Sequence, residues 1–211
     1  MLLPTLLALA ASATAAVHSS HPHSHLHHRD HDASLAKPKK FGAEGFYKQQ
    51  CLTHHNIHRQ NHSALALTWS DALASTAQKI ASTCKFEHDV EMDGGGYGQN
   101  IASGIGQENV SAVITELWYN NEIGEFGEQY GVGSPSEEKF ELWGHFSQVV
   151  WKGSREVGCW TEHCPNGVEL AEDTFDYTVC NYGGPGNVEG EYAENVGAPV
   201  GMTTESWSYT Q

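Results

Sequence analysis

The stretch Gly-His-Phe-Ser-Gln-Val-Val-Trp-Lys-Gly-Ser at residues 144–154 is the most informative part of this sequence. Within it, Phe146, Val149 and Val150 recur at helical spacing, so the sequence predicts a short helix with one apolar face. His145 lies at the start of that helix. Taken alone, a histidine there packs and hydrogen-bonds more often than it binds a ligand. Its role therefore depends on the sequence around it.

Three further helices are predicted upstream of this stretch. Residues 45–61 are compatible with a helix, and Ser70 is a suitable N-cap for a second helix. The second helix has apolar residues at helical spacing, namely Leu73, Ala77, Ile80 and Ala81. The clearest amphipathic pattern is a stripe that we expect to face the core, formed by Val110, Val113, Ile114, Leu117 and Trp118.

Strand signals come late in the chain. Apolar and polar residues alternate at residues 157–161 and again at residues 175–179. Residues 99–102 follow a glycine-rich turn and are a third candidate strand. Helices followed by a late hairpin indicate an α+β fold with an antiparallel sheet.

The two ends differ in composition from the centre. Residues 1–16 are apolar and end in the small-x-small pattern of a cleavage site, which predicts a signal peptide and secretion. Residues 17–43 hold half of the 14 histidines, which predicts a disordered segment or a pro-segment cut after Lys39-Lys40. We expect the globular domain at residues 44–192 and a flexible tail at residues 193–211.

The charge balance and the hydrophobic content exclude some partners. The formal net charge is −15, and an acidic surface repels phosphates and anionic headgroups, so we expect no nucleic-acid partner. Hydrophobic residues make up 39% of the chain, which is enough for a core. After residue 16 no segment is long and apolar enough to span a membrane.

Cysteines and acceptor sequons suggest covalent modifications of a secreted protein. The chain has five cysteines, so at least one is unpaired or pairs between chains, and the sequence alone does not give the connectivity. They are Cys51, Cys84, Cys159, Cys164 and Cys180. Asn61 and Asn109 begin sequons for N-glycosylation.

Residues 144–154 resemble the first signature of the CAP superfamily, which comprises cysteine-rich secretory proteins, antigen 5 and pathogenesis-related 1 proteins. Residues 180–188 resemble the second signature, although Thr178 replaces a usual apolar residue and Pro185 comes one position late. Further motifs follow in family order, namely His55-Asn56 with Arg59, Leu67-Thr68-Trp69, residues 97–102, and Trp118-Tyr119 before Glu122. The resemblance covers residues 44–192 and points to a secreted fungal type.

The resemblance implies an α-β-α sandwich, in which a small antiparallel sheet lies between helical layers. It also implies a wide cleft with two histidines and two acidic residues. At the matching positions this chain has His88 and His145 as the histidines, and Gln99 and Glu122 at the acidic positions. By the same analogy the disulfides are Cys84–Cys159 and Cys164–Cys180, and Cys51 is spare, in a monomer or in a dimer linked through Cys51.

The four cleft positions fit a loosely bound metal better than a catalytic one. Two neutral imidazoles can bind Zn²⁺ or another divalent metal, and Glu122 can fix the tautomer of one of them. Gln99 in place of a carboxylate weakens the attraction for a cation and removes a candidate general base. A hydrolytic zinc usually has three protein ligands, so we expect no catalytic residue here. We expect His55, Asn56 and Arg59 to tie the first helix to the core.

The resemblance also implies that the protein binds and exports sterols or related small lipids. In secreted fungal relatives a loop after the third helix lines the lipid site. The matching residues 119–143 contain Ile123, Phe126, Tyr130 and Phe140 among glycines, which allow a loop to open around a flat ligand. The alternative interpretation is that these side chains pin the loop to the core.

Two other functions stay open at this stage. One is a metal-dependent secreted endopeptidase that uses His88, His145 and Glu122, against which Gln99 and the missing third ligand count. The other is a secreted virulence or defence-modulating protein whose surface binds a host or cell-surface protein.

Overall fold

The computed structural model of the chain describes residues 43–165, 174–202 and 204. The predicted signal peptide at residues 1–16 and the histidine-rich segment up to residue 42 lie outside the described residues. None of the described helices is long and apolar enough to cross a membrane.

A four-stranded sheet in the order β1-β3-β4-β2 lies at the centre of the domain. The strands β2 (Tyr97–Ser103), β3 (Glu156–Cys164) and β4 (Phe175–Gly183) pair antiparallel, which confirms the three predicted strands. A fourth strand that was not predicted, β1 (Thr68–Trp69), pairs parallel to β3 and makes the otherwise antiparallel sheet mixed. Two residues are too few to show a period-2 pattern, so no local pattern predicts β1.

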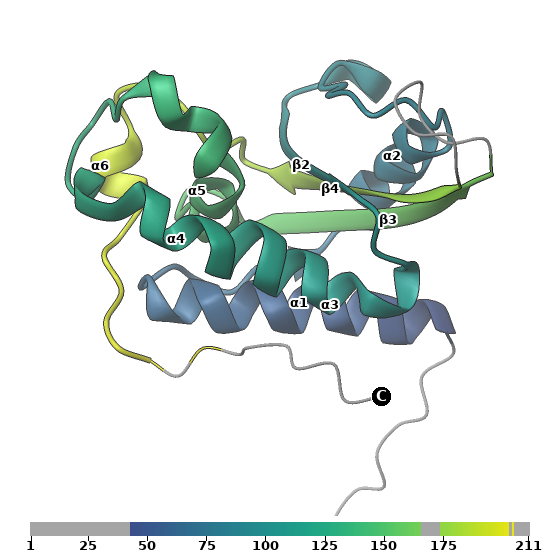
Figure 1. Cartoon of the computed structure of the whole chain (residues 1–211), viewed down its shortest axis with the longest axis horizontal. Helices are drawn as coiled ribbons and strands as arrows, with labels where there is room; N and C mark the ends of the chain where they lie inside the picture. The colour runs from purple at the N-terminus through teal and green to yellow at the C-terminus, as the bar shows by residue number, and fades with distance from the viewer. Residues whose placement is uncertain (1–42, 166–173, 203, 205–211) are drawn as a thin grey trace, which may run out of the picture. The chain divides into compact units, whose positions relative to one another are not determined.

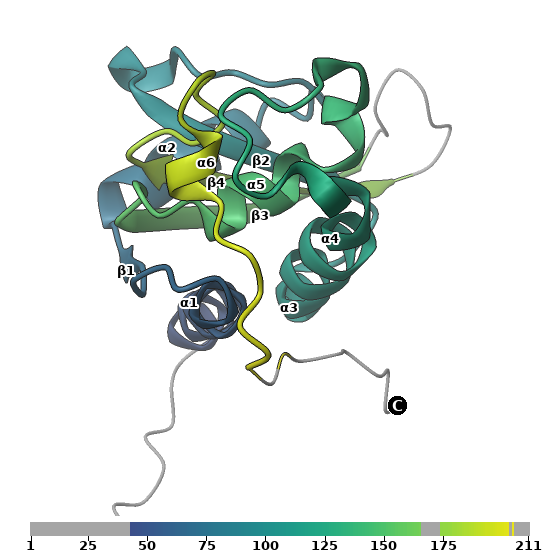
Figure 2. The same cartoon turned by 90° about the vertical axis from the view of Figure 1, so that its left-hand side faces the viewer.

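Helices cover both faces of the sheet, as the α-β-α prediction required (Figures 1 and 2). The helix α2 (Asp71–Ala81) packs on one face, where its residues Ala77 and Ile80 share a core cluster with Tyr177 and Val179 of β4. On the other face, α1 (Ala43–Asn61) and α5 (Gly144–Val150) share a second core cluster with Cys180 and Tyr182. Alternate residues of β4 thus face opposite layers, as the pleat of a strand dictates.

The predicted start of α2 is confirmed, because a side chain caps this helix. The Ser70 hydroxyl accepts a hydrogen bond from the Leu73 amide at 3.4 Å and caps α2, as expected. The amphipathic stripe from Val110 forms α3 (Val110–Ala112) and continues as the π-helix η3 (Val113–Asn120) and as α4 (Asn121–Phe126). The segment predicted as a loop from residue 119 therefore begins as a helix.

Short 3-10 turns complete the domain. They are η1 (Met92–Gly94), η2 (Gln107–Asn109), η4 (Gly127–Gln129) and η5 (Glu137–Leu142). In chain order, η1 precedes β2, η2 follows it, and η4 and η5 lie between α4 and α5.

Two disulfides staple the sheet, but their pairing differs from the prediction. The structure joins Cys159 to Cys180 and Cys84 to Cys164. Cys159 and Cys180 are direct partners in the β3–β4 register, with Cα atoms 4.1 Å apart, so the sheet itself selects this pair. Cys51 is free and fully buried, which opposes the predicted dimer linked through this thiol.

The first part of the predicted flexible tail is ordered against the domain. The helix α6 (Tyr192–Asn195) leads into Val196, which is 1% exposed. The Val200 amide donates to the Asn61 carbonyl at 2.8 Å, and the Met202 amide donates to Asn61 Oδ1 at 2.9 Å. These contacts attach residues 192–202 to the end of α1.

Candidate functional site

The first half of the predicted cleft is built on the start of α5. His145 Nδ1 lies 2.6 Å from Glu122 Oε1, and the other carboxylate oxygen accepts the Phe146 amide at 2.9 Å. The imidazole also stacks on Trp118, with ring centroids 6.0 Å apart and planes 14° from parallel. Because a carboxylate only accepts, the neutral His145 imidazole carries its hydrogen on Nδ1 and presents the lone pair of Nε2.

The second half of the cleft is built on β2. Gln99 Oε1 lies 2.9 Å from His88 Nδ1 and accepts the Asp89 amide at 3.1 Å. Gln99 Nε2 donates to the Asp89 carbonyl at 2.9 Å and to Asn181 Oδ1 at 3.0 Å, which fixes the orientation of this amide. The oxygen facing His88 can therefore only accept, so the neutral His88 imidazole also carries its hydrogen on Nδ1 and leaves the Nε2 lone pair unused.

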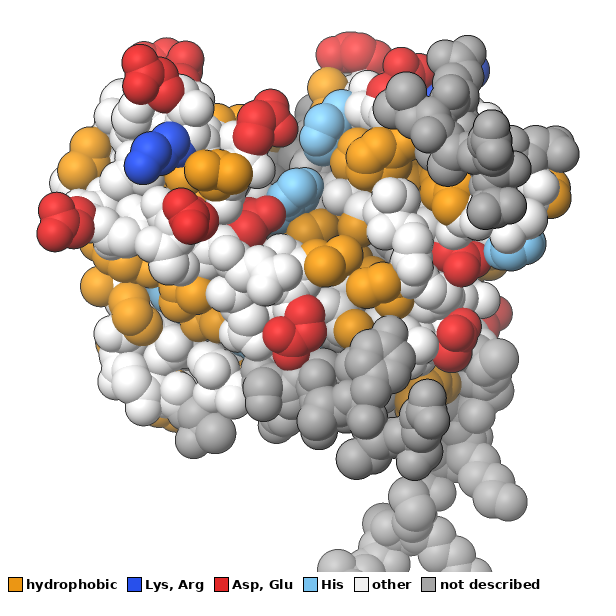
Figure 3. Space-filling view, viewed as in Figure 1, with side chains coloured by type: hydrophobic (Ala, Val, Ile, Leu, Met, Phe, Trp, Pro, Cys, Tyr) orange, Lys and Arg blue, Asp and Glu red, His pale blue; other side chains and the backbone are white. Residues whose placement is uncertain are grey.

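The edge strand β2 connects the two histidines, although they are far apart in the sequence. Gln99 anchors His88, and the next residue, Asn100, donates to the His145 carbonyl at 3.1 Å. Figure 3 shows two histidine side chains in one hollow on the face viewed, one of them against an acidic side chain. This arrangement fits the contact of His145 with Glu122.

The site can offer two imidazole nitrogens to a ligand from outside. His88 is exposed and the His145 side chain is 30% exposed, so solvent reaches both. Within residues 43–165 and 174–204, no group of three or more His, Cys, Asp or Glu side chains is arranged to hold a metal ion. Gln99 and Glu122, the other two predicted cleft positions, are the hydrogen-bond partners of His88 and His145.

A second group of histidines, which the sequence analysis did not single out, lies inside the domain along α1. His54 Nδ1 and His58 Nε2 lie 2.8 and 2.9 Å from the same atom, Thr115 Oγ1 of η3. His62 Nε2 lies 2.9 Å from the Tyr119 hydroxyl, and His58 stacks on the Tyr119 ring at 3.8 Å. The i, i+4, i+8 spacing of these three histidines was the sequence signal for a shared helix face.

Burial controls the protonation of the α1 histidines. Desolvation lowers the pKa of His55 and of His58 from 6.5 to about 3, and it lowers the pKa of His62 as well. In each case burial is the largest cause, because an imidazolium loses its hydration inside the protein. The neighbouring histidines lower the pKa of His58 further. All three are therefore neutral at pH 7.

His55, Asn56 and Arg59 join α1 to the rest of the domain. His55 Nδ1 lies 2.8 Å from the Cys51 carbonyl and Nε2 lies 2.8 Å from the Tyr182 hydroxyl. Asn56 makes two hydrogen bonds to the backbone of Leu67. The buried Arg59 guanidinium donates to four carbonyl oxygens at 2.8–3.0 Å, those of Leu65, Val149, Trp151 and Ser154.

The predicted lipid-loop residues have different environments. Phe126 is fully buried against Trp143 and Phe146, so in this conformation its ring packs in the core, and its role in lining a ligand site stays a prediction. Ile123 and Tyr130 are partly buried against the same core. Phe140 lines a pocket of about 340 Å³.

The two sequons also differ in the folded chain. The side chain of Asn61 is 95% buried within α1, since the residue is 5% exposed and its amide donates to the Tyr119 hydroxyl at 3.0 Å. A glycan on that nitrogen does not fit this contact, which contradicts the prediction for Asn61. Asn109 is half-buried at the end of η2, and its glycosylation stays a prediction.

Together, the α-β-α layers, the two disulfides and the two-histidine site define a class of disulfide-stapled domains. The sequence model of the cysteine-rich secretory protein family, CAP, matches residues 52–182. The chain therefore belongs to the CAP family.

Relatives come from fungi and plants. A probable pathogenesis-related protein of Arthroderma benhamiae is 54% identical over 158 residues, which are 74% of this chain and 50% of that protein. Protein PRY2 of Saccharomyces cerevisiae is 38% identical over 71% of this chain and 41% of the relative. Pathogenesis-related protein 1A of Nicotiana tabacum is 34% identical over 68% of this chain and 79% of the relative. The chain thus spans about half the length or less of these two fungal relatives.

Solved structures support the fold. Na-ASP-1 has a TM-score of 0.59 at 18% identity, covering 82% of this chain and 48% of that one. NaASP2, crystallised with Zn²⁺, has a TM-score of 0.55 at 22% identity, covering 72% of this chain and 87% of that one. At these identities the likeness concerns the fold alone.

Proposed function

We propose that this chain is an extracellular carrier of sterols or related small lipids. The observation that carries the proposal is the pocket of about 340 Å³ beneath the segment that follows α4. Its lining combines four apolar or aromatic residues, Pro135, Phe140, Trp143 and Tyr192, with polar and acidic ones, namely Ser134, Asn187, Glu137, Glu141 and Glu189. Transfer of a sterol from water to the apolar part of this lining is favourable by about 25 cal/mol for each Å² of apolar surface covered.

The segment above this pocket has the means to open. Gly127 and Gly131 have φ angles of +47° and +82°, which are readily accessible only to glycine. A Cβ atom at Gly124, Gly127 or Gly131 meets no atom within 4 Å, so the backbone has open space around it. A pocket of 340 Å³ is at the small end for a lipid-sized ligand, so this movement is part of the proposal.

Unsatisfied polar atoms near the pocket match the single hydroxyl of a sterol. The Trp143 indole nitrogen and the Tyr130 hydroxyl are buried and have no hydrogen-bond partner in the described chain. A buried donor without a partner costs about 1–3 kcal/mol, and a ligand hydroxyl that reached the indole N–H would relieve this cost. Trp143 is a lining residue of the pocket, which supports a hydrogen bond from its indole N–H to a ligand hydroxyl.

Equilibrium binding of radiolabelled ergosterol and cholesterol to the full chain tests the proposal. We expect saturable binding that Phe140→Ala weakens, because this ring lines the pocket. Leu142→Ala is the matched control, since Leu142 belongs to the same 3-10 turn but is 48% exposed and lies outside the pocket. Absence of saturable binding by the folded protein, or equal losses in both variants, contradicts the proposal.

We also propose that His88 and His145 bind a divalent cation such as Zn²⁺ loosely. Both imidazoles present the Nε2 lone pair, and their Nδ1–H groups are held by acceptor oxygens, which is the arrangement of metal-binding histidines in proteins. The site has two ligands, and Gln99 stands where a carboxylate could act as a general base. Both features favour an exchangeable ion. For the same reason we do not advance an endopeptidase activity.

A further inference from the structure

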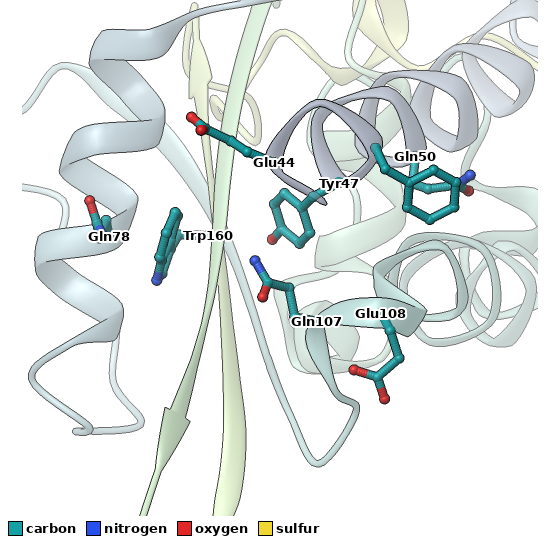
Figure 4. Close-up of a pocket in the computed structure, with 8 residues that line it drawn as sticks. Glu44, Tyr47, Gln50, Gln78, Gln107, Glu108 and Trp160 are labelled. Atoms are coloured by element: carbon teal, nitrogen blue, oxygen red, sulfur yellow. The ribbon is translucent and has the colours of Figure 1, made fainter. Parts of the chain in front are cut away.

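A groove between α1, α2, η2 and β3 belongs to neither of the sites above. Its larger part is a pocket of about 510 Å³ (Figure 4). Three aromatic rings, three primary amides and two carboxylates line it, namely Phe46, Tyr47, Trp160, Gln50, Gln78, Gln107, Glu44 and Glu108. The labelled side chains in Figure 4 surround one space and come from four different elements.

The chemistry of this lining excludes several ligand classes. No Lys, Arg or His lines the pocket, so a phosphate, a sulfated sugar or a nucleic acid meets no opposite charge there. Its three glutamine side chains distinguish it from the pocket lined by the segment after α4, whose lining contains no glutamine. Aromatic faces beside amides and carboxylates suit a neutral ligand that has flat apolar patches and many hydroxyl groups.

Hydrogen bonds hold two of the rings and leave the amides available. The Tyr47 hydroxyl lies 3.0 Å from Thr161 Oγ1, and the Trp160 indole nitrogen donates to Glu162 Oε2 at 2.9 Å. In the described part of the chain, the side chains of Gln50, Gln78 and Gln107 make no hydrogen bond to another residue. Each primary amide offers two donors and one acceptor oxygen, which matches a hydroxyl that both donates and accepts.

The groove is longer than a single pocket. A second pocket of about 470 Å³ shares Glu44, Tyr47, Gln78 and Trp160 with the first. Its own lining adds Trp69 and the ion pair of Lys48 with Asp71 (3.5 Å), so the one cation of this second pocket already faces a carboxylate. The Lys48 ammonium also lies over the Trp69 ring, 5.5 Å from its centroid. Two adjoining pockets that share one aromatic wall suit a chain of several linked rings.

We infer that this groove binds a neutral oligosaccharide, with sugar rings stacked on Phe46 and Trp160, the largely buried Tyr47 at its base, and hydroxyls bonded to the glutamine amides. The apolar C–H face of a hexose packs on an aromatic ring, while its hydroxyls need donors and acceptors at the ring edge. Phe46 is 50% exposed at the groove, so a bound sugar would cover apolar surface that now faces water.

Isothermal titration of the full chain with chitohexaose and with laminarihexaose tests the inference. These probes distinguish a chitin source from a β-glucan source of the same neutral chemistry. We expect at least one to bind saturably and a heparin-derived hexasaccharide not to bind. Phe46→Ala and Gln107→Ala should each weaken the binding about five- to tenfold, as expected for one stacking or hydrogen-bonding contact.

Phe86→Ala is the matched control, because Phe86 is a comparably exposed aromatic residue, at 41%, that lines neither part of the groove. Its affinity should equal that of the parent protein, and ergosterol binding should be unchanged in Phe46→Ala. Failure of both neutral probes to bind the folded protein overturns the inference, as does stronger binding of the sulfated sugar or an equal loss in Phe46→Ala and Phe86→Ala. Because sterol binding is measured separately, its failure is distinguishable from these results.

Discussion

The histidines of α1 and those of the cleft show how one residue type acquires two roles in a single domain. His55, His58 and His62 are 0% exposed and lie between α1 and its neighbours, whereas His88 and His145 are open to solvent beside β2. Both groups make short hydrogen bonds. The two groups differ in whether a ring nitrogen is left without a hydrogen bond. In each cleft imidazole, Nε2 makes no hydrogen bond within the described chain. In His55 and His62, both ring nitrogens have partners.

This difference supports a role in stability for the α1 histidines and is consistent with the cation binding that we propose for the cleft histidines. Burial makes the charged form of the α1 histidines unfavourable, so these residues support the fold only while they are neutral. The cleft imidazoles have acceptor partners at Nδ1 and a free lone pair outward, so an incoming cation meets prepared ligands. The count of 14 histidines therefore says little until each environment is known.

The largest expected effect is a loss of stability in acid that originates in α1. His55 and His58 have a pKa of about 3 in the folded chain against 6.5 for an unperturbed imidazole. Between these values the unfolded chain binds more protons, so the free energy of unfolding falls as pH drops below 6.5, by about 1.4 kcal/mol per pH unit for each histidine. Denaturant titrations from pH 7.5 to pH 4.5 measure this slope.

A pair of variants locates the source of that slope. His58→Gln keeps an amide that can hydrogen-bond to the Thr115 hydroxyl but cannot titrate, so its stability should fall less steeply with acid than that of the parent chain. His88→Gln makes the same change at an exposed cleft histidine and is the matched variant. If stability falls with acid equally in the two variants, the slope does not originate in His58.

The next effect concerns the cleft and the proposed cation. Glu122→Gln keeps an oxygen that can accept from His145 Nδ1 but removes the negative charge, so Zn²⁺ affinity should fall about 10- to 100-fold. Glu125→Gln is the control, since Glu125 is an exposed carboxylate of the same helix α4. Calorimetric titration of both variants with Zn²⁺ measures the difference. Equal Zn²⁺ affinities of the two variants would mean that Glu122 does not contribute to metal binding.

A smaller effect is expected at Gln99. A carboxylate there would attract a cation, but it would lose the two hydrogen bonds that the amide donates to the Asp89 carbonyl and to Asn181. Gln99→Glu should therefore raise Zn²⁺ affinity while it lowers the free energy of unfolding by about 1–3 kcal/mol. Thermal melts with and without Zn²⁺ show both changes, and a variant as stable as the parent without metal contradicts the role given to the amide.

The sequence predicted the parts of the fold that have a strong local signal. Ser70 caps a helix, and alternating residues in 157–161 and 175–179 form strands, because propensity and burial agree there. The disulfides depended instead on the strand register, which sets Cys159 opposite Cys180 and which no local pattern encodes.

Sequence motifs predicted the residues of the candidate site, but they did not predict the hydrogen bonds between those residues. His88 and Gln99 are 11 residues apart in the sequence and meet only because the chain turns back at the glycines before β2. Likewise, the burial of Phe126 follows from α4, which continues the preceding π-helix where a loop was expected. The π-helix leaves no distinct period in so short a segment.

The smallest expected effect is the alkylation of Cys51 in the folded chain. It extends the comparison to a group whose pKa burial raises, whereas burial lowers the pKa of a histidine. Burial raises the pKa of the Cys51 thiol well above its usual range, just as it lowers the pKa of His55 one helical turn later, because in both cases the charged form is disfavoured. Since the thiolate is the reactive species, iodoacetamide at pH 8 should leave the folded chain unlabelled and add one group per chain in 6 M urea, as counted by mass spectrometry ~1 h after addition. The unreduced protein should also run without a disulfide-linked dimer. Rapid labelling of the folded chain would mean that α1 opens frequently, and the low pKa of His55 would then not persist in solution.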